Sequence, residues 1–105
     1  MLLAQVKGPV VASAKLDNLS GRRLLLAEVL TVRPDGLHST GRKLVCVDAV
    51  SAGTGEIVLV VMGSSARTAP ELGAVPTDAA IVAILEGLSA DGERLDLGRV
   101  AEGAG

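Results

Sequence analysis

The residues of this chain that could do nucleophilic or metal chemistry are few, and their spacing predicts neither. His38 and Cys46 are the sole histidine and cysteine among the 105 residues, too small a set for an ordinary zinc site without carboxylate ligands. A nucleophilic cysteine also needs a neighbouring base and partial exposure. Cys46 lies between Val45 and Val47, so we interpret it as a small buried apolar residue. His38 lies among turn residues, and we interpret it as a solvated loop residue.

Two small-residue segments share parts of known motifs but lack the spacing that defines them. Ser64 and Ser65 stand in Gly-Ser-Ser-Ala-Arg, which differs from the Gly-x-Ser-x-Gly nucleophile elbow, so a helix-capping role is the better interpretation. Residues 51–55 contain Gly-x-Gly, but an apolar β-type run follows them, whereas a dinucleotide-binding loop opens a helix. We interpret 51–55 as a tight turn between two strands.

Asp48 stands inside the apolar run 44–50, where an unpaired buried carboxylate would be costly. Either its side chain faces solvent, or it accepts hydrogen bonds from backbone amides or from an arginine such as Arg67. The sequence alone leaves both alternatives open. Together, these residues predict a protein that is not an enzyme and that holds no cofactor and no metal.

Around these residues the chain is divided in the manner of an all-β protein. Short runs rich in Val, Leu and Ile are separated by Gly, Asp, Ser and Pro. The run 23–33 would also suit a helix by length and apolarity, but its β-branched end and the following Pro-Asp-Gly turn favour a strand. The predicted strands cover residues 3–13, 23–33, 43–50, 56–62 and 80–85.

Shorter elements complete the prediction. Residues 63–69 have the serine-capped composition of a short helix, and Thr77-Asp78 after Pro76 would cap another brief turn. Asp91-Gly92 predicts a hairpin turn, with a last short strand over 95–100 and a frayed tail from residue 101. The composition changes after residue 86, so we divide the chain into a barrel domain at 1–87 and a C-terminal extension at 88–105.

This pattern predicts a single all-β domain, a small five-stranded OB-like Greek-key β-barrel, partly open, with one or two short helices. Open sheet edges invite pairing with another chain. The sequence is 49% hydrophobic with a mean hydropathy of +0.48, yet it has no aromatic residue. The excess of Val, Leu, Ile and Ala indicates either a very dense core or apolar surface hidden against copies of the chain, and we favour the second.

The charge balance argues against a polyanionic partner. Ten Lys plus Arg against twelve Asp plus Glu give a net charge of −2, whereas nucleic-acid binders have a basic excess and single-strand binders add aromatic stacking residues. An OB-like nucleic-acid-binding or other protein-interaction module is therefore the alternative function. No apolar run approaches the roughly 20 residues that span a bilayer, and the N-terminus lacks a signal-peptide pattern. We expect a cytoplasmic protein without nucleic-acid or membrane partners.

Four segments agree in order and spacing with one known family. The first is Gln-Val-Lys-Gly-Pro-Val-Val-Ala-Ser at 5–13, where Pro9 stands at a position more often Thr, and the second is Leu-Ser-Gly-Arg-Arg-Leu-Leu-Leu at 19–26. The third, at 47–60, is similar to the signature Asp-Ala-Val-Gly-Ala-Gly, with Ser51 for its first glycine. The fourth joins 63–67 to 76–84. In this combination the chain resembles the pentameric vertex shell proteins of bacterial microcompartments, the carboxysome and ethanolamine-utilisation corner proteins.

The resemblance implies a β-barrel that assembles as a flat-topped homopentamer in the bacterial cytoplasm. Such pentamers close the corners of a shell whose facets consist of hexameric and pseudohexameric shell proteins, because a sheet of hexagons alone cannot close. The resemblance also implies that Asp48 and Arg67 support the subunit fold or interface, and that the turn at 51–55 borders a narrow opening on the five-fold axis. The axis residues so implied are Ser51, Ala52, Gly53, Thr54 and Gly55.

Overall fold

The computed structural model of the chain describes residues 1–11, 23–63, 79–90 and 92–102. Its five longer strands confirm the predicted runs, and three strands of two residues follow them. These ranges contain no helix, and the predicted helices at 63–69 and near 77–78 lie outside them apart from Gly63. The strands are β1 (Leu2–Val10), β2 (Arg23–Arg33), β3 (Gly36–Asp48), β4 (Ile57–Met62), β5 (Ala79–Ile84), β6 (Ser89–Ala90), β7 (Glu93–Arg94) and β8 (Val100–Ala101).

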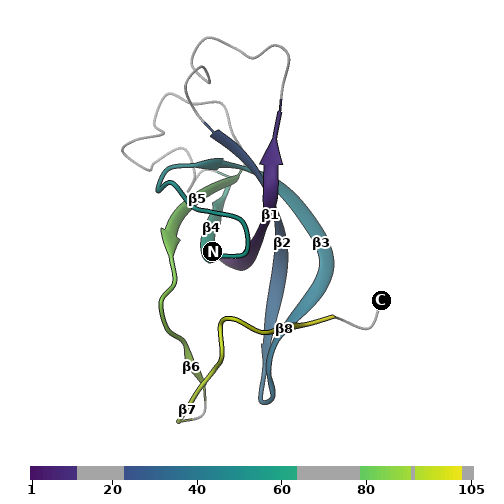
Figure 1. Cartoon of the computed structure of the whole chain (residues 1–105), viewed down its shortest axis with the longest axis vertical. Coiled ribbons are helices and arrows are strands. Elements are labelled where there is room, and N and C mark those ends of the chain that lie inside the picture. The colour runs from purple at the N-terminus through teal and green to yellow at the C-terminus, as the bar shows by residue number, and fades with distance from the viewer. Residues whose placement is uncertain (12–22, 64–78, 91, 103–105) are drawn as a thin grey trace.

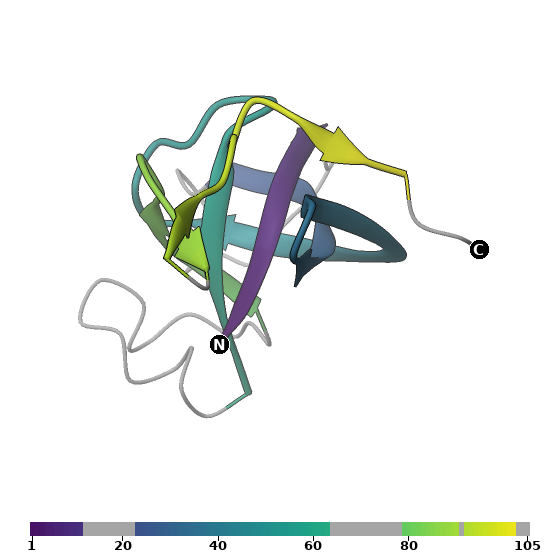
Figure 2. The same cartoon turned by 90° about the horizontal axis from the view of Figure 1, so that it is seen from below.

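The five longer strands close into a barrel, seen end-on in Figure 2. Their order is β2-β1-β4-β5-β3, and β3 pairs with β2 again to complete the circle. The pairings are antiparallel except the one between β3 and β5, which is parallel and has two register pairs, Val47 with Ala80 and Asp48 with Ile81. The all-β barrel is confirmed, but the expectation that it is partly open is wrong, because β3 pairs with β2 on one side and β5 on the other.

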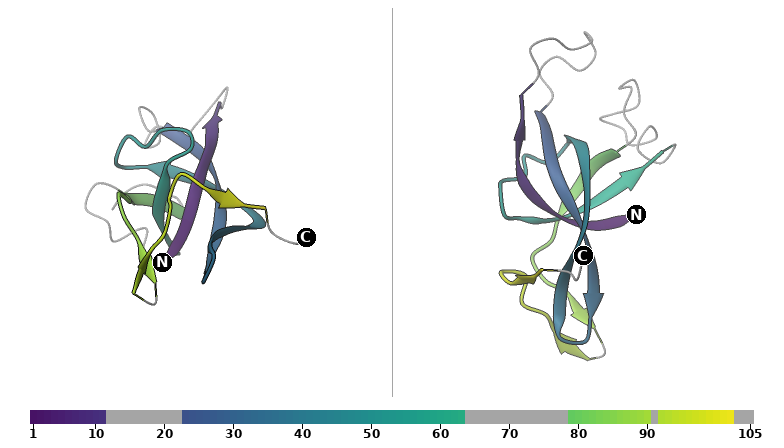
Figure 3. Two further views of the ribbon diagram at one scale, coloured as in Figure 1. Left: turned by 60° about the horizontal axis from the view of Figure 1, so that its bottom comes forward. Right: turned by 90° about the vertical axis from the view of Figure 1, so that its right-hand side faces the viewer.

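The β2–β3 hairpin continues beyond the barrel, below it in Figure 1 and in the right-hand view of Figure 3. Pro34 and Asp35 form its turn, and β3 begins at Gly36, seven residues before the predicted start at 43. The segment 36–42 is polar, so its composition hid the strand, but its backbone pairs with residues 30–33 of β2. His38 therefore lies in a strand, which corrects its placement in a loop.

The barrel interior is filled by aliphatic and small side chains. Alternate residues of each strand point inward, as expected for a sheet with one face on the core. The chain has no aromatic side chain to fill this space. Small alanines pack beside the larger valines, leucines and isoleucines instead. The buried members of this cluster are Ala4, Val6, Leu25, Ala27, Cys46, Ala52, Val58, Val60, Ala79 and Ile81.

The C-terminal segment folds back onto the extended hairpin. The hairpin predicted around Asp91-Gly92 is confirmed as β6–β7, and β8 pairs in parallel with β3 at Leu37 and His38 (Figure 1). The strand predicted over 95–100 is wrong, because the Asp96 carboxylate accepts a hydrogen bond from the Gly98 amide at 2.8 Å and turns the chain. Leu95 is buried in a separate apolar cluster with Leu30, Leu37 and Ile57. The division at residue 87 stays a prediction, and residues 103–105 lie outside the described chain.

Candidate functional site: the loop after β3

The loop at residues 49–56, between β3 and β4, is organised by a buried carboxylate. Asp48 ends β3, and its Oδ1 accepts hydrogen bonds from the Val50 amide at 3.0 Å and the Ala52 amide at 3.2 Å. Its Oδ2 lies 3.0 Å from the same Ala52 amide. Of the two alternatives that the sequence left open, the structure therefore shows the one with backbone amide donors. The start of the loop therefore wraps around the side chain of Asp48, the last residue of β3.

An arginine completes the surroundings of this carboxylate, and it is a different arginine from the one suggested by sequence. Arg23 begins β2 directly opposite Asp48 in the register, and its Nη1 lies 3.5 Å from Oδ2. The Asp48 side chain is 1% exposed and that of Arg23 56% exposed. Arg67 lies outside the described residues, so its role stays a prediction.

β1 holds the other end of the loop through Val6. The Gly55 amide donates to the Val6 carbonyl at 2.8 Å, and the Val6 amide donates to the Glu56 carbonyl at 3.0 Å. Within the loop, the Glu56 carboxylate accepts a hydrogen bond from the Gly53 amide, while the Glu56 amide donates to the Gly53 carbonyl at 3.1 Å. The loop is thus fixed at both ends and internally, as a supported turn linking two strands.

The backbone of this loop also explains its small residues. Ser51 has a φ of 59° and Gly55 a φ of 90°, both in the left-handed region that disfavours residues with a Cβ. Ala52 is fully buried and belongs to the interior cluster, so a larger side chain there would have to displace its neighbours. Ser51, Thr54 and Gly55 are exposed. The exposed surface of residues 51–55 is therefore formed by small side chains on a hydrogen-bonded backbone.

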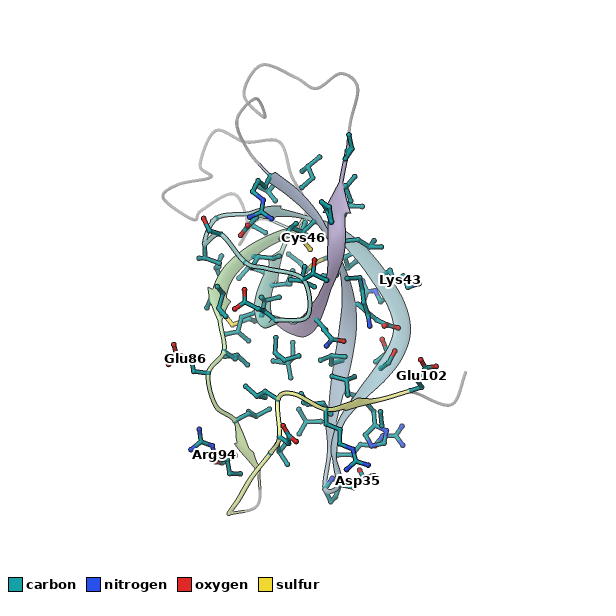
Figure 4. All side chains as sticks on the ribbon, in the orientation of Figure 1. Asp35, Lys43, Cys46, Glu86, Arg94 and Glu102 are labelled. Carbon is teal, nitrogen blue, oxygen red and sulfur yellow. The ribbon has the colours of Figure 1, made fainter. Side chains whose placement is uncertain are left out.

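Cys46 and His38, the other residues considered for chemistry, do not form a reactive group with this loop. Cys46 is fully buried inside the barrel, as predicted, and burial raises the pKa of its thiol to about 11 (Figure 4). His38 Nε2 lies 2.8 Å from Asp35 Oδ1 at the far end of the β2–β3 hairpin, and the hydrogen bond from His38 lowers the pKa of Asp35. Ser64 and Ser65 lie outside the described chain.

A second buried carboxylate, Glu28, was missed by the sequence reasoning. Its Oε2 accepts hydrogen bonds from the Ser39 hydroxyl and from the Gly41 amide at 3.1 Å, and its Oε1 lies 3.4 Å from Lys7 Nζ. The pKa of Glu28 is lowered, chiefly by the Ser39 hydrogen bond, with burial opposing and Lys7 and Gly41 assisting. A signal was present in the sequence, since Glu28 is the one charged residue within the otherwise largely apolar run 24–32.

The described residues give two further negative findings. Over 1–11, 23–63, 79–90 and 92–102, no three His, Cys, Asp or Glu side chains are grouped as a metal-binding set. In the same part of the chain, no helix has the length and apolar character needed to cross a membrane.

Comparison with known proteins gives one consistent family. Residues 1–86 match the family described as ethanolamine utilisation protein EutN/carboxysome. The shell vertex protein GrpN of Rhodospirillum rubrum (strain F11) is 43% identical over 86 residues, covering 82% of this chain and 93% of GrpN.

Solved structures agree with the sequence relatives. A carboxysome subunit, CcmL, superposes with a TM-score of 0.81 at 37% identity, covering 94% of this chain and 100% of CcmL. The pentameric microcompartment shell protein GrpN from Rhodospirillum rubrum gives a TM-score of 0.74 at 42% identity over 86% of this chain and 99% of GrpN.

Proposed function

We propose that this chain, which belongs to the ethanolamine utilisation EutN/carboxysome family and is a structural shell vertex protein, not an enzyme, forms homopentamers that close the corners of a bacterial microcompartment. The observation that carries the proposal is the match to a pentameric shell protein over 99% of that protein's length at 42% identity. The relatives favour this function over the alternative of an OB-like nucleic-acid-binding module.

Within the pentamer, the loop after β3 is proposed to face the five-fold axis through Ser51, Gly53, Thr54 and Gly55. Ala52, which the resemblance also implied as an axis residue, is fully buried in the barrel interior and so does not line the opening. Five copies converge at such an axis, so the chain nearest to it has little room for side chains. The loop suits that position because its exposed residues within 51–55 are small and its backbone is fixed by Asp48 and Glu56. Asp48 is proposed to support the loop, and so the assembly, from inside the barrel.

The partners proposed are the hexameric and pseudohexameric shell proteins of the facets. Pentagons supply the curvature that a flat hexagonal sheet lacks. The shell location follows from the family, and the bacterial cytoplasm is proposed as its compartment, in keeping with a single buried cysteine that cannot form an internal disulfide. Coexpression with facet proteins tests the pairing: closed polyhedra should appear in electron micrographs with this chain, and open tubes or sheets without it.

The primary test is the mass of the purified protein by light scattering. A value five times the 10.6 kDa chain supports the proposal, and a monomer at micromolar concentration contradicts it.

The axis placement is tested separately by the substitution Gly53→Leu. Gly53 does not have a positive φ, and an added Cβ would meet only the flexible Glu56 carboxylate, at 3.2 Å, so the subunit itself should tolerate the change. If five copies converge there, the pentamer should weaken.

Gly98 offers a matched control for that substitution. It also lacks a positive φ, and its added Cβ would also lie 3.2 Å from a carboxylate oxygen, that of Asp96, but in the C-terminal turn. Gly98→Leu should leave the pentamer intact. Equal stability of the pentamer in both variants would remove the loop from the axis while leaving the pentamer itself standing.

A further inference from the structure

The outer wall of the barrel carries an apolar row where an isolated barrel would be polar. The strand register places Val10 beside Leu24, Leu24 beside Val47, Val47 beside Ala80, and Ala80 beside Val61. Residues paired in this way project from the same face of the sheet. Leu25, Cys46 and Ile81, chain neighbours of three residues of the row, belong to the interior cluster, so the row lies on the outer wall. Within the single chain, Val47 and Ala80 are already buried there, at 2% and 0% exposure.

A second apolar row lies next to the first. Gly8 pairs with Leu26, and Leu26 pairs with Val45, two residues along each strand from the first row. Val45 is 53% exposed and Leu26 partly exposed. We call the two rows together the apolar belt: Val10, Leu24, Val47, Ala80 and Val61 in the first, and Gly8, Leu26 and Val45 in the second.

The belt is bordered by a polar row. Two residues further along β2 and β3, and three along β1 because of the register shift between Val6 and Gly8, Gln5 pairs with Glu28 and Glu28 with Lys43. Lys7 lies 3.4 Å from the Glu28 carboxylate. Lys43 projects from the outer side of β3 in Figure 4. The outer face thus changes from apolar to charged over a few residues. An apolar centre with a polar rim is the organisation of a protein–protein interface.

Both faces of β2 and β3 are therefore apolar along the belt. Leu25 and Cys46 fill the interior while Leu24, Leu26 and Val45 line the outside. A sheet with one solvated face alternates apolar and polar residues, whereas a sheet covered on both faces reads as a continuous apolar run. The run Leu24-Leu25-Leu26-Ala27 is of the second kind, so the part of the outer face that the single chain leaves exposed, around Val45 and Leu26, requires a cover.

We propose that the cover is a neighbouring copy of this chain, and that the exposed part of the belt around Val45 and Leu26 is one side of the contact between adjacent subunits of the ring. This inference rests on the proposed function. A ring is built from head-to-tail contacts, so the belt of one subunit meets a different surface of the next. Pentameric neighbours with the same fold supply the reason for choosing a second copy as the occupant. Val47, in the middle of the first row, directly precedes Asp48 on β3, so the contact would adjoin the loop proposed for the axis.

The test places a charge in the belt. Val45→Glu puts a carboxylate into a desolvated contact and should raise the protein concentration at half-assembly by about tenfold or more. Val32→Glu is the matched control, because Val32 is a 42%-exposed valine on β2, in the hairpin beyond the barrel and outside the belt. Mass is read by light scattering over a dilution series, and folding by circular dichroism.

Each outcome decides the matter. Dissociated, folded V45E together with pentameric V32E supports the belt as the contact. If V45E stays as firmly pentameric as the unsubstituted protein, or if it only lowers the melting temperature at unchanged mass, the belt is covered within one chain and the inference is wrong. If the unsubstituted protein is itself monomeric, the proposed function fails first. Should V45E be insoluble, V45T keeps the shape of valine and should still shift half-assembly roughly threefold.

Discussion

Asp48 and Arg23 lie opposite each other in the β2–β3 register, 3.5 Å apart, yet they occupy different environments. The carboxylate is 1% exposed and the guanidinium 56% exposed. An ion pair with one exposed partner is screened by water, whereas the amides of Val50 and Ala52 meet the carboxylate out of solvent. The amides therefore contribute more to the stability of the loop than the arginine does.

Asp48→Ala should lower the free energy of unfolding by about 2–4 kcal/mol, because the buried Ala52 amide and the partly buried Val50 amide lose their acceptor. Arg23→Gln should cost less than about 1 kcal/mol, since it removes only the screened pair. Chemical unfolding at one fixed protein concentration measures both, because assembly adds to apparent stability. An Arg23 effect as large as that of Asp48 would contradict this ordering.

A substitution at Ser51 should be able to raise the stability of the fold, because this residue has a φ of 59°. A left-handed backbone costs a residue with a Cβ about 1–2 kcal/mol, and glycine is free of that cost although its unfolded chain is more flexible. Ser51→Gly should therefore leave stability unchanged or raise it by about 1 kcal/mol, and Ser51→Val should lower it. The two melting temperatures check this. A fall with glycine and none with valine would mean that residue 51 does not have the left-handed backbone on which this prediction rests.

Glu28 should make the protein sensitive to acid. Its pKa is lower in the folded chain than in the unfolded chain, so its contribution is complete above the ordinary glutamate pKa and is lost as the pH falls through the lowered folded value. Glu28→Gln should cost roughly 1–2 kcal/mol at neutral pH and should flatten the loss of stability between neutral and acidic pH. Urea unfolding over that range measures the slope. Glu86→Gln, at an exposed glutamate, is the control and should leave the slope unchanged.

Cys46 should be inert in the native protein. With a pKa of about 11 and no exposed surface, the thiol is almost entirely protonated at pH 8. A thiol reagent such as a disulfide dye should react on the order of a hundredfold more slowly with native protein than with protein in urea. Equal rates in the two conditions would mean that the barrel opens readily around β3.

The parts of the fold that were predictable are those whose apolar pattern reports burial. The five longer strands follow the Val, Leu and Ile runs, and Cys46 was correctly placed in the core because it interrupts a valine run. The first part of β3 was missed because residues 36–42 are polar. Their strand conformation comes from pairing with β2, which is a tertiary effect that composition does not record.

The candidate site depended on register, which the sequence does not state. Asp48 was recognised as an unusual residue, but its arginine partner, Arg23, follows from its position opposite Asp48 across two strands. The Glu28 network and the apolar belt have the same origin, because each consists of residues far apart in sequence that the register brings into one row.

The two-pair parallel join between β3 and β5 has a consequence for the order of events in the cell. β5 is the last barrel strand to be synthesised, and contacts between distant segments form more slowly than a local hairpin such as β2–β3. Val47 and Ala80 meet on the outer wall at this join, while Asp48 and Ile81 meet beside it. One closing event thus completes the interior and the outer wall together. A subunit should therefore join the pentamer only after its barrel has closed, which would exclude incompletely folded chains from the assembly.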